Sequence, residues 1–252
     1  MAESLVRAFI RTQVRLCRLF DKLLPKPFGV DGNTDFRERI VPQFLGENMV
    51  VYDMGGGRCP LINLQRKTEL NLKVFGLDID TTELAFAPEG AYDAVICADI
   101  TQYRGKGDAD IVICQAVLEH VPDPAAAFLA IAGTLKPGGV ALIFAPCRNA
   151  IFARLNLLVP ERLKRTILYA IFPEKREKGG FRAYYRQCTP RDFLGLAKKS
   201  GFKALALRSY FMSSYFSFFF PLYLFWRVWI LASYITAGSQ AAETFSLALR
   251  KT

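Results

Sequence analysis

Two small groups of residues in this sequence have the types and spacing to bind a nucleoside. Gly55, Gly56 and Gly57 follow an apolar run, and such a glycine-rich turn lets a ligand approach the backbone closely. Asp78 follows 21 residues after Gly57, at the end of a second apolar run. An acid at that distance can hydrogen-bond the ribose hydroxyls of a bound nucleoside. The chemistry indicated is therefore the binding of a nucleoside cofactor.

The details of the glycine run distinguish two kinds of cofactor. The turn and Asp78 alone fit NAD and S-adenosylmethionine (SAM) equally well. A dinucleotide fingerprint needs a third glycine, so that helix and strand pack tightly beneath a pyrophosphate, but Pro60 occupies that place here. SAM has no pyrophosphate, and its site depends less on that geometry. The residues of the turn therefore favour SAM.

Five segments, in order and with normal spacing, resemble the motifs of the class I SAM-dependent methyltransferases, in particular the methyltransferase type 11 domain. They are residues 51–57, 76–79, 98–100, 110–124 and 135–139. The resemblance covers roughly residues 48–146, with weaker support toward the C-terminus. One departure is Cys59, where the family usually has glycine, and it bears on the finer geometry of the turn.

The resemblance implies a role for several residues around a bound SAM molecule. It implies that Gly55 and Gly57 flank the methionyl part, that Asp78 binds the ribose and that Asp99 meets the adenine amine. It also implies that Gln115 lies beside the methionine end. The full set of cofactor-binding residues that we expect is Asp53, Gly55, Gly57, Asp78, Ile79, Asp99, Ile100 and Gln115.

Three residues are candidates for the acceptor side of a methyl transfer. The reaction is an in-line displacement, so positioning supplies much of the rate. A hydroxyl acceptor also needs a base, whereas an amine, a carboxylate or an acidic carbon does not have to have one. The catalytic candidates are His120, Tyr184 and Tyr185. Packing roles, in a core or in a lid, are the alternative for all three.

The cysteine and histidine content argues against a metal centre. The six cysteines are scattered without a C-x-x-C pair, so their spacing predicts neither a disulfide framework nor a zinc site. His120 is the single histidine, which excludes a site built from several histidines. We therefore expect no metal.

The order of elements along the chain predicts a doubly wound α/β fold. Buried strands are expected at 49–54, 74–77, 94–97, 110–114 and 140–145, with further strands at 202–210 and 243–250. Helices are expected at about 60–70, from Asp123 to before Lys136, and from Thr189 to Ser200. Strands and helices alternating in this way predict a mostly parallel, seven-stranded Rossmann-like sheet with an antiparallel last strand.

Two segments outside this pattern suggest contact with a membrane. A helix is expected from about Ser4 to Leu24, with a basic stripe formed by Arg7, Arg11, Arg15, Arg18 and Lys22, and these charges also exclude a cleaved signal peptide. Residues 211–235 are extremely apolar, and Pro221 predicts two short helices in a hairpin that dips into one leaflet. The alternatives are that the helix is solvated and the apolar segment is a dimer interface.

We therefore expect residues 1–47 to form a basic helix and lead-in, and residues 48–252 to form a SAM-dependent methyltransferase domain. Insertions are expected at 147–188, the region that recognises the methyl acceptor, and at 211–240. The net charge of +10 favours an anionic membrane surface, and no nucleic-acid motif accompanies it. The function predicted is methyl transfer to a lipid-like or lipid-linked acceptor, glycans included, on the cytoplasmic face of a membrane. A soluble enzyme for a small hydrophobic metabolite, in homodimeric form, and a non-catalytic scaffold are the alternatives.

Overall fold

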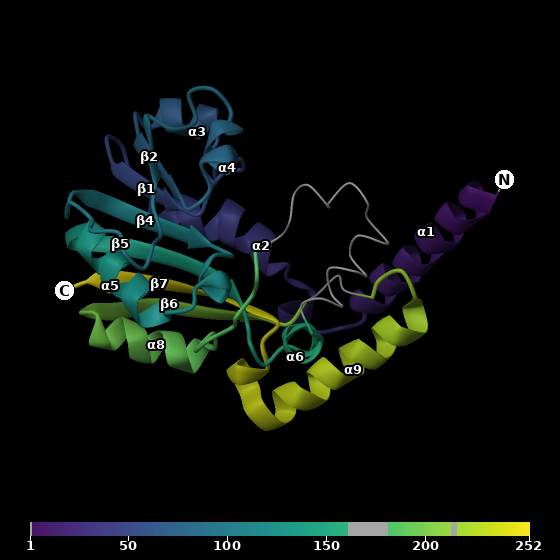
Figure 1. Ribbon diagram of the computed structural model, residues 1–252. Helices are drawn as coiled ribbons and strands as arrows, with labels where there is room; N and C mark the ends of the chain where they lie inside the picture. The colour runs from purple at the N-terminus through teal and green to yellow at the C-terminus, as the bar shows by residue number, and fades with distance from the viewer. Residues whose placement is uncertain (1, 161–180, 213–215) are drawn as a thin grey trace.

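The computed structural model describes residues 2–160, 181–212 and 216–252 (Figure 1). Its strands are β1 (Val50–Met54), β2 (Lys73–Asp78), β3 (Ala94–Cys97), β4 (Ala109–Gln115), β5 (Leu135–Pro146), β6 (Phe202–Tyr210) and β7 (Thr244–Lys251). They form one sheet in the order β3-β2-β1-β4-β5-β7-β6. The pairs from β3 through β5 are parallel, and β7 is antiparallel to both of its neighbours. This confirms the predicted sheet and its antiparallel last strand.

The helices include α1 (Ala2–Asp21), α2 (Gly32–Asp35), α3 (Leu64–Glu69), α4 (Thr81–Ala85), α5 (Pro124–Thr134), α6 (Ile151–Leu158), α8 (Pro190–Lys199) and α9 (Phe220–Ala237). Short turns of helix lie at η1 (Lys26–Gly29), η2 (Phe36–Ile40), η3 (Val41–Gln43), η4 (Leu118–His120) and η6 (Gly238–Ala241). The predicted caps are confirmed: the Asp123 side chain accepts from Ala126 N, and Thr189 Oγ1 accepts from Asp192 N. The central part of the 147–188 insertion, residues 161–180, lies outside the described residues.

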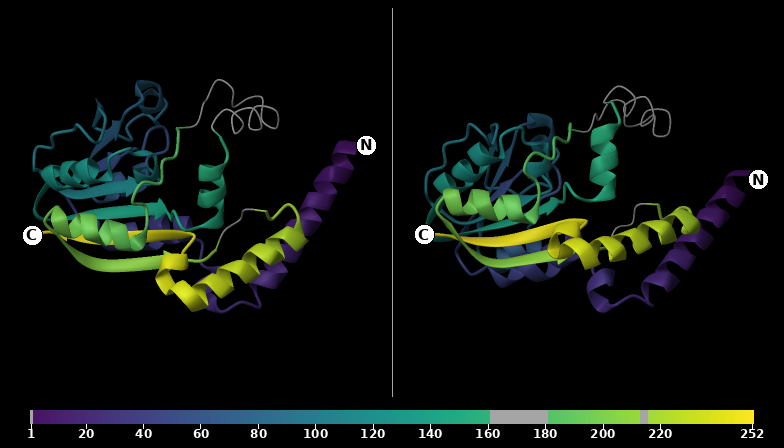
Figure 2. Two further views of the ribbon diagram at one scale, coloured as in Figure 1. Left: turned by 60° about the horizontal axis from the view of Figure 1, so that its bottom comes forward. Right: turned by 90° about the horizontal axis from the view of Figure 1, so that it is seen from below.

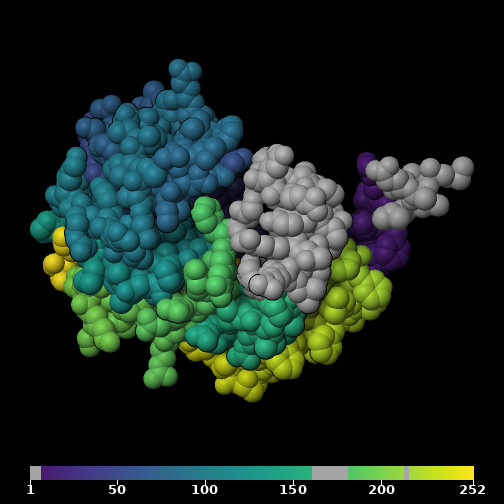
Figure 3. Space-filling view, in the orientation of Figure 1, coloured from purple at the N-terminus to yellow at the C-terminus, as the bar shows by residue number. Residues whose placement is uncertain are grey.

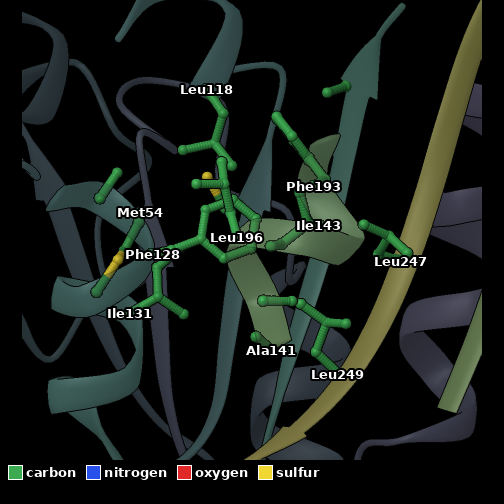
Figure 4. Close-up of a cluster of buried hydrophobic side chains, with 14 of the residues drawn as sticks. Met54, Leu118, Phe128, Ile131, Ala141, Ile143, Phe193, Leu196, Leu247 and Leu249 are labelled. Atoms are coloured by element: carbon green, nitrogen blue, oxygen red, sulfur yellow. The ribbon is translucent and has the colours of Figure 1, made fainter. Parts of the chain in front are cut away.

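Hydrophobic side chains fill both faces of the sheet. On one face, α5 and α8 cover β1, β4, β5 and β7, and Figure 4 shows the side chains that meet there. The labelled residues are Met54, Leu118, Phe128, Ile131, Ala141, Ile143, Phe193, Leu196, Leu247 and Leu249. On the other face, Phe36, Ile40 and Val41 pack against the strands. Residues 36–41 belong to the predicted lead-in, 1–47, and bury hydrophobic side chains against the sheet.

Two sequence predictions of helices need correction. The helix expected from about Pro60 begins at Leu64 instead, because Asn63 caps it by accepting from Arg66 N, and Leu61 N is used in holding the preceding turn. The two-helix hairpin expected at 211–235 is wrong. Pro221 stands in the first turn of a continuous α9, where a missing N–H costs no hydrogen bond. The insertion does leave and return at one edge, since Tyr210 pairs with Thr244.

The partner of α9 is α1, and no local pattern in the sequence predicts this pairing. The two helices lie side by side and project beyond the sheet (Figures 1 and 2). One candidate membrane-spanning helix, 220–241, meets the length and composition criteria among the described residues. The remaining helices serve the sheet domain, whose strands end at the candidate site.

Candidate functional site

The turn after β1 has a backbone shape that requires glycine at two positions. Gly55 and Gly57 have φ angles of 79° and 48°, in the left-handed region that favours glycine. A Cβ atom on Gly55 would overlap the Val117 side chain, and one on Gly57 would lie 3.1 Å from Asp78 Oδ2. Gly55 N donates to Leu77 O at 2.6 Å, which ties the turn to β2. The turn is therefore packed closely against Val117 and Asp78, with no room for a side chain at Gly55.

Asp53 holds this turn from beneath. Its carboxylate is buried, and Oδ2 accepts from Leu61 N at 2.8 Å and from the Tyr92 hydroxyl at 3.4 Å. Burial raises the pKa of Asp53 to about 6. The sequence prediction placed Asp53 among the cofactor-binding residues; the structure gives it the role of positioning the turn.

A cavity of about 220 Å³ opens beside the turn, at the carboxyl ends of the parallel strands. In α/β sheets of this kind ligands bind at that edge. The lining residues are Gly55, Leu77, Asp78, Ile79, Ala98, Asp99, Ile100, Ala116, Val117, His120, Val121, Pro122 and Phe181. The structure thus brings together five of the predicted cofactor-binding residues, which are Gly55, Asp78, Ile79, Asp99 and Ile100, and one catalytic candidate.

The two acids of the lining come from neighbouring strands. Asp78 ends β2, where its Oδ1 accepts from Asp80 N at 3.0 Å and burial raises the pKa of its carboxyl. Asp99 follows β3, and its Oδ1 accepts from both the backbone N and the hydroxyl of Thr101 at 2.8 Å. Two fixed acceptors on adjacent strands fit the ribose hydroxyls and the adenine amine expected from the sequence.

His120 lines the same cavity. Its Nδ1 lies 3.1 Å from the carbonyl of Arg182, which can only accept, so Nδ1 carries the hydrogen and Nε2 is left as a base. Nε2 lies 3.7 Å from Glu119 Oε1. Burial lowers the pKa of His120 and raises that of Glu119 to about 8. Both groups are therefore neutral at pH 7, and the pair is not an ion pair.

The two tyrosine candidates lie outside the residues that line the cavity in the described part of the chain. The Tyr184 and Tyr185 N–H groups donate to the Glu119 carbonyl, which sets the position of their segment. Tyr185 is buried in the main core, with a φ of 49°, and the guanidinium of Arg182 lies over the Tyr184 ring. Phe181 lines the cavity in their place.

Sequence reasoning missed two residues that contact Gln115, the residue expected beside the methionine end of SAM. Gln115 Nε2 donates to Asn33 Oδ1, and Arg37 Nη1 donates to Gln115 Oε1 at 3.3 Å. Both partners come from the segment before β1, about 80 residues away in sequence, so no local pattern could have found them. Arg37 also places a positive charge toward Asp53, whose pKa it lowers slightly against the effect of burial. This guanidinium suits the carboxylate of an amino-acid moiety.

Residues 52–143 match a family model described as a methyltransferase domain. Similar curated proteins are the ubiquinone biosynthesis O-methyltransferases of Ralstonia nicotianae, 27% identical over 165 residues, and of Colwellia psychrerythraea, 30% identical over 168 residues. Each match covers 63% of this chain. It spans 64% and 62% of the two relatives, less than two thirds of their length.

Two solved structures share the fold. A phosphoethanolamine N-methyltransferase of Haemonchus contortus, in complex with SAM, is 18% identical, with a TM-score of 0.54 over 93% of this chain and 56% of that one. A SAM-dependent methyltransferase of Mesorhizobium loti is 16% identical, with a TM-score of 0.56 over 86% of this chain and 98% of that one. At these identities the likeness concerns the architecture alone.

Proposed function

The chain is a member of the class I SAM-dependent methyltransferase family, and from this premise we propose that it methylates an oxygen of a lipid-like or lipid-linked acceptor at a membrane surface. The observation that carries the proposal is the cavity in which Gly55, Asp78, Asp99 and His120 meet. Three of these suit the cofactor, and the fourth is a base.

The residues of the chain divide the work of such a transfer. When bound, SAM supplies a methyl group on a sulfonium centre. The methyl group would pass to the acceptor oxygen, and the electron pair of the S–CH₃ bond would remain on sulfur. His120 Nε2 takes the hydroxyl proton, since Nδ1 is held by the Arg182 carbonyl. The glycine turn and Asp78 keep the cofactor in line with that oxygen.

Two observations support an apolar acceptor methylated on oxygen. On the His120 side the cavity is lined by Val117, Val121, Pro122 and Phe181, so a hydrocarbon acceptor is favoured there over a strongly hydrated one. The relatives of higher identity are named as O-methyltransferases of ubiquinone biosynthesis, whereas the solved relative from Haemonchus is named for a nitrogen acceptor. The neutral histidine base favours the oxygen acceptor.

The test is transfer of labelled methyl from SAM to a fractionated cell extract. We expect the label to move into an organic-soluble, membrane-derived product, and His120→Ala to lower turnover by about 10²–10⁴-fold with little change in SAM affinity. Tyr184→Phe is the matched control, because this side chain lies outside the cavity lining. Label only in water-soluble small molecules would point instead to the soluble-metabolite enzyme. Binding of SAM without any methyl transfer would point to a non-catalytic scaffold.

A further inference from the structure

Helices α1 and α9 form one two-helix unit that is joined by specific contacts. Gln13 Oε1 accepts from Phe220 N at 2.9 Å, in the first turn of α9, and the rings of Phe20 and Phe220 meet edge to face at 6.3 Å. Farther along, Phe28 and Tyr234 meet edge to face at 5.2 Å. Because the contacts advance together along both segments, the two helices run in the same direction.

A buried arginine fixes the unit to the sheet domain. Arg227 of α9 is 1% exposed, and its guanidinium donates to the carbonyls of Phe28 and Phe211 at 2.5 Å each. Its Nε lies 3.2 Å from Asp21 Oδ1 at the end of α1, and the Tyr223 hydroxyl donates to Asp21 Oδ2 at 2.7 Å. Removing one member of such a network would leave a buried charge without its partner, so α9 cannot turn this face elsewhere.

The outward side of the unit is apolar and accessible. Phe225 is 66% exposed, Ile235 83% and Leu23 81%. The other large exposed apolar side chains of the unit are Phe9, Ile10, Leu16, Leu19, Phe218, Phe219, Leu222, Val228, Trp229 and Tyr234. In Figure 3 the yellow-green α9 forms the lower right margin of the molecule. An exposed apolar area of this extent marks an interaction surface.

A cationic stripe runs beside this surface. The exposed basic residues are Arg7, Arg11, Arg15 and Arg18 on α1, with Lys22 in the turn just after it. The exposed Leu16 and Leu19 share another stripe of the same helix, and Leu23 follows them in that turn. At 100° per residue the two stripes are neighbours. Apolar side chains flanked by arginines are the pattern of a helix that lies in an anionic membrane interface.

We propose that the α1–α9 unit is a docking surface for an anionic lipid bilayer and that both helices lie in the plane of the interface. The charge pattern selects this occupant, because exposed cations beside an apolar surface complement the anionic headgroups of a bilayer. Spanning is opposed by Arg227, Tyr223 and Trp226, which are buried against α1 and the sheet domain. Both ends of the insertion are also tied to the sheet, where Glu243 N donates to Tyr210 O. The inference rests on the proposed function only in that docking would bring the cavity near a lipid-like acceptor.

Tryptophan fluorescence tests the proposal directly, because the chain has two tryptophans, Trp226 buried and Trp229 48% exposed, both on α9. With vesicles of phosphatidylglycerol and phosphatidylcholine, we expect a blue shift, and stronger quenching by lipids brominated near the headgroup than near the chain end. Trp229→Phe should abolish both effects while Trp226 remains as an internal reference. Strongest quenching at the bilayer centre would contradict in-plane docking.

Vesicle flotation supplies the matched variants. We expect Arg11→Glu with Arg15→Glu and Arg18→Glu to lower partition roughly 100-fold at low salt and little at high salt. Phe225→Ser with Leu222→Ser should lower it at least about tenfold at any salt. The control is Phe86→Ser with Leu129→Ser, which removes side chains 63% and 59% exposed elsewhere on the sheet domain.

Failure of the wild type to float would overturn the proposal, and a blue shift of Trp229 that follows protein concentration without vesicles would assign the surface to a second copy. Either result would remove the membrane surface from the proposed function but leave its methyl transfer intact, because transfer to an extracted acceptor is measured without vesicles. Conversely, flotation without any methyl transfer would contradict the proposed enzymatic function and support the docking surface.

Discussion

Ionisable side chains are buried both in the α1–α9 unit and at the cofactor edge, by which we mean the carboxyl ends of the strands around the cavity lined by Gly55, Asp78, Asp99 and His120. The two regions differ in how these side chains are paired. At the cofactor edge Asp53, Asp78 and Glu119 are buried carboxyls whose pKa values are all raised, chiefly by burial. In the α1–α9 unit Arg227 is equally buried, yet it is paired with Asp21 and held by two backbone carbonyls. A buried charge that lies beside its counter-ion and donates to two carbonyls holds structure together.

The buried carboxyls at the cofactor edge, by contrast, bind protons more tightly than exposed carboxyls do, because burial raises their pKa values. Burial without a matching cation favours their neutral forms, and groups of this kind gather at functional sites. The difference teaches that the two regions should respond to different perturbations. The cofactor edge should respond to pH and to the ligand, and the α1–α9 unit to loss of its one buried cation.

The largest expected effect is on the α1–α9 unit. Arg227→Ala should lower the free energy of unfolding by about 3–5 kcal/mol, since Asp21 is left without its cation and two carbonyls lose their donor. Urea denaturation measures the change. The matched control is Arg39→Ala, because Arg39 is 74% exposed and lies 3.8 Å from Asp35, so its loss should cost less than about 1 kcal/mol. Equal losses in the two variants would mean that Arg227 does not fix the α1–α9 unit to the sheet domain.

The next effect belongs to the cofactor edge. Asp78→Ala should weaken SAM binding by about 1.5–3 kcal/mol, the loss expected for hydrogen bonds to a charged group. Titration calorimetry on the folded variant measures it. Asp80→Ala, two residues along and outside the cavity lining, is the control and should bind SAM almost as tightly as the wild type. Unchanged affinity in Asp78→Ala would remove the ribose assignment.

A pH effect distinguishes Glu119. The folded protein keeps its proton up to about pH 8, whereas the unfolded chain releases it near the ordinary pKa of glutamate. The folded state therefore binds more protons in between, and stability falls as the pH rises through this window, by up to about 1.4 kcal/mol per pH unit. Denaturation should be measured from about pH 6 to pH 8, because Asp53, whose pKa is about 6, contributes mainly below this range. The free energy of unfolding should show this slope in the wild type and a flatter one in Glu119→Gln. The same slope in both would place the proton elsewhere.

The smallest effect is expected at Tyr184. Its side chain lies outside the cavity lining and stacks with Arg182, so Tyr184→Phe should change stability by less than about 0.5 kcal/mol and leave turnover nearly unaltered. A loss of turnover comparable to that of His120→Ala would restore it as a catalytic residue. Steady-state kinetics with the identified acceptor decides between them.

The success of sequence reasoning followed how local each signal was. Strand periods, the capping residues Asp123 and Thr189, and the glycine turn are read within a few residues, and the structure has them where they were expected. The position of Asp78 and Asp99 at one edge followed from parallel topology, which the alternation of elements predicts.

The errors came from contacts between distant segments. Pro221 permits either a break between helices or the first turn of a helix, and the choice is made by α1, which lies some 200 residues earlier. Asn33 and Arg37 reach Gln115 only through the folded sheet. The catalytic role of Tyr184 and Tyr185 stays a prediction, and the hydrogen bonds of their N–H groups to the Glu119 carbonyl leave no mark in the sequence.

The measurement that tests the central claim most directly is a pair of calorimetric titrations of the wild-type chain, one with SAM and one with NAD. Because Pro60 stands where a dinucleotide site needs glycine, while Asp78, Asp99 and the glycine turn line the cavity, we predict saturable binding of SAM at one site and no measurable binding of NAD. Binding of NAD in preference to SAM, or of neither, would contradict the assignment of this cavity.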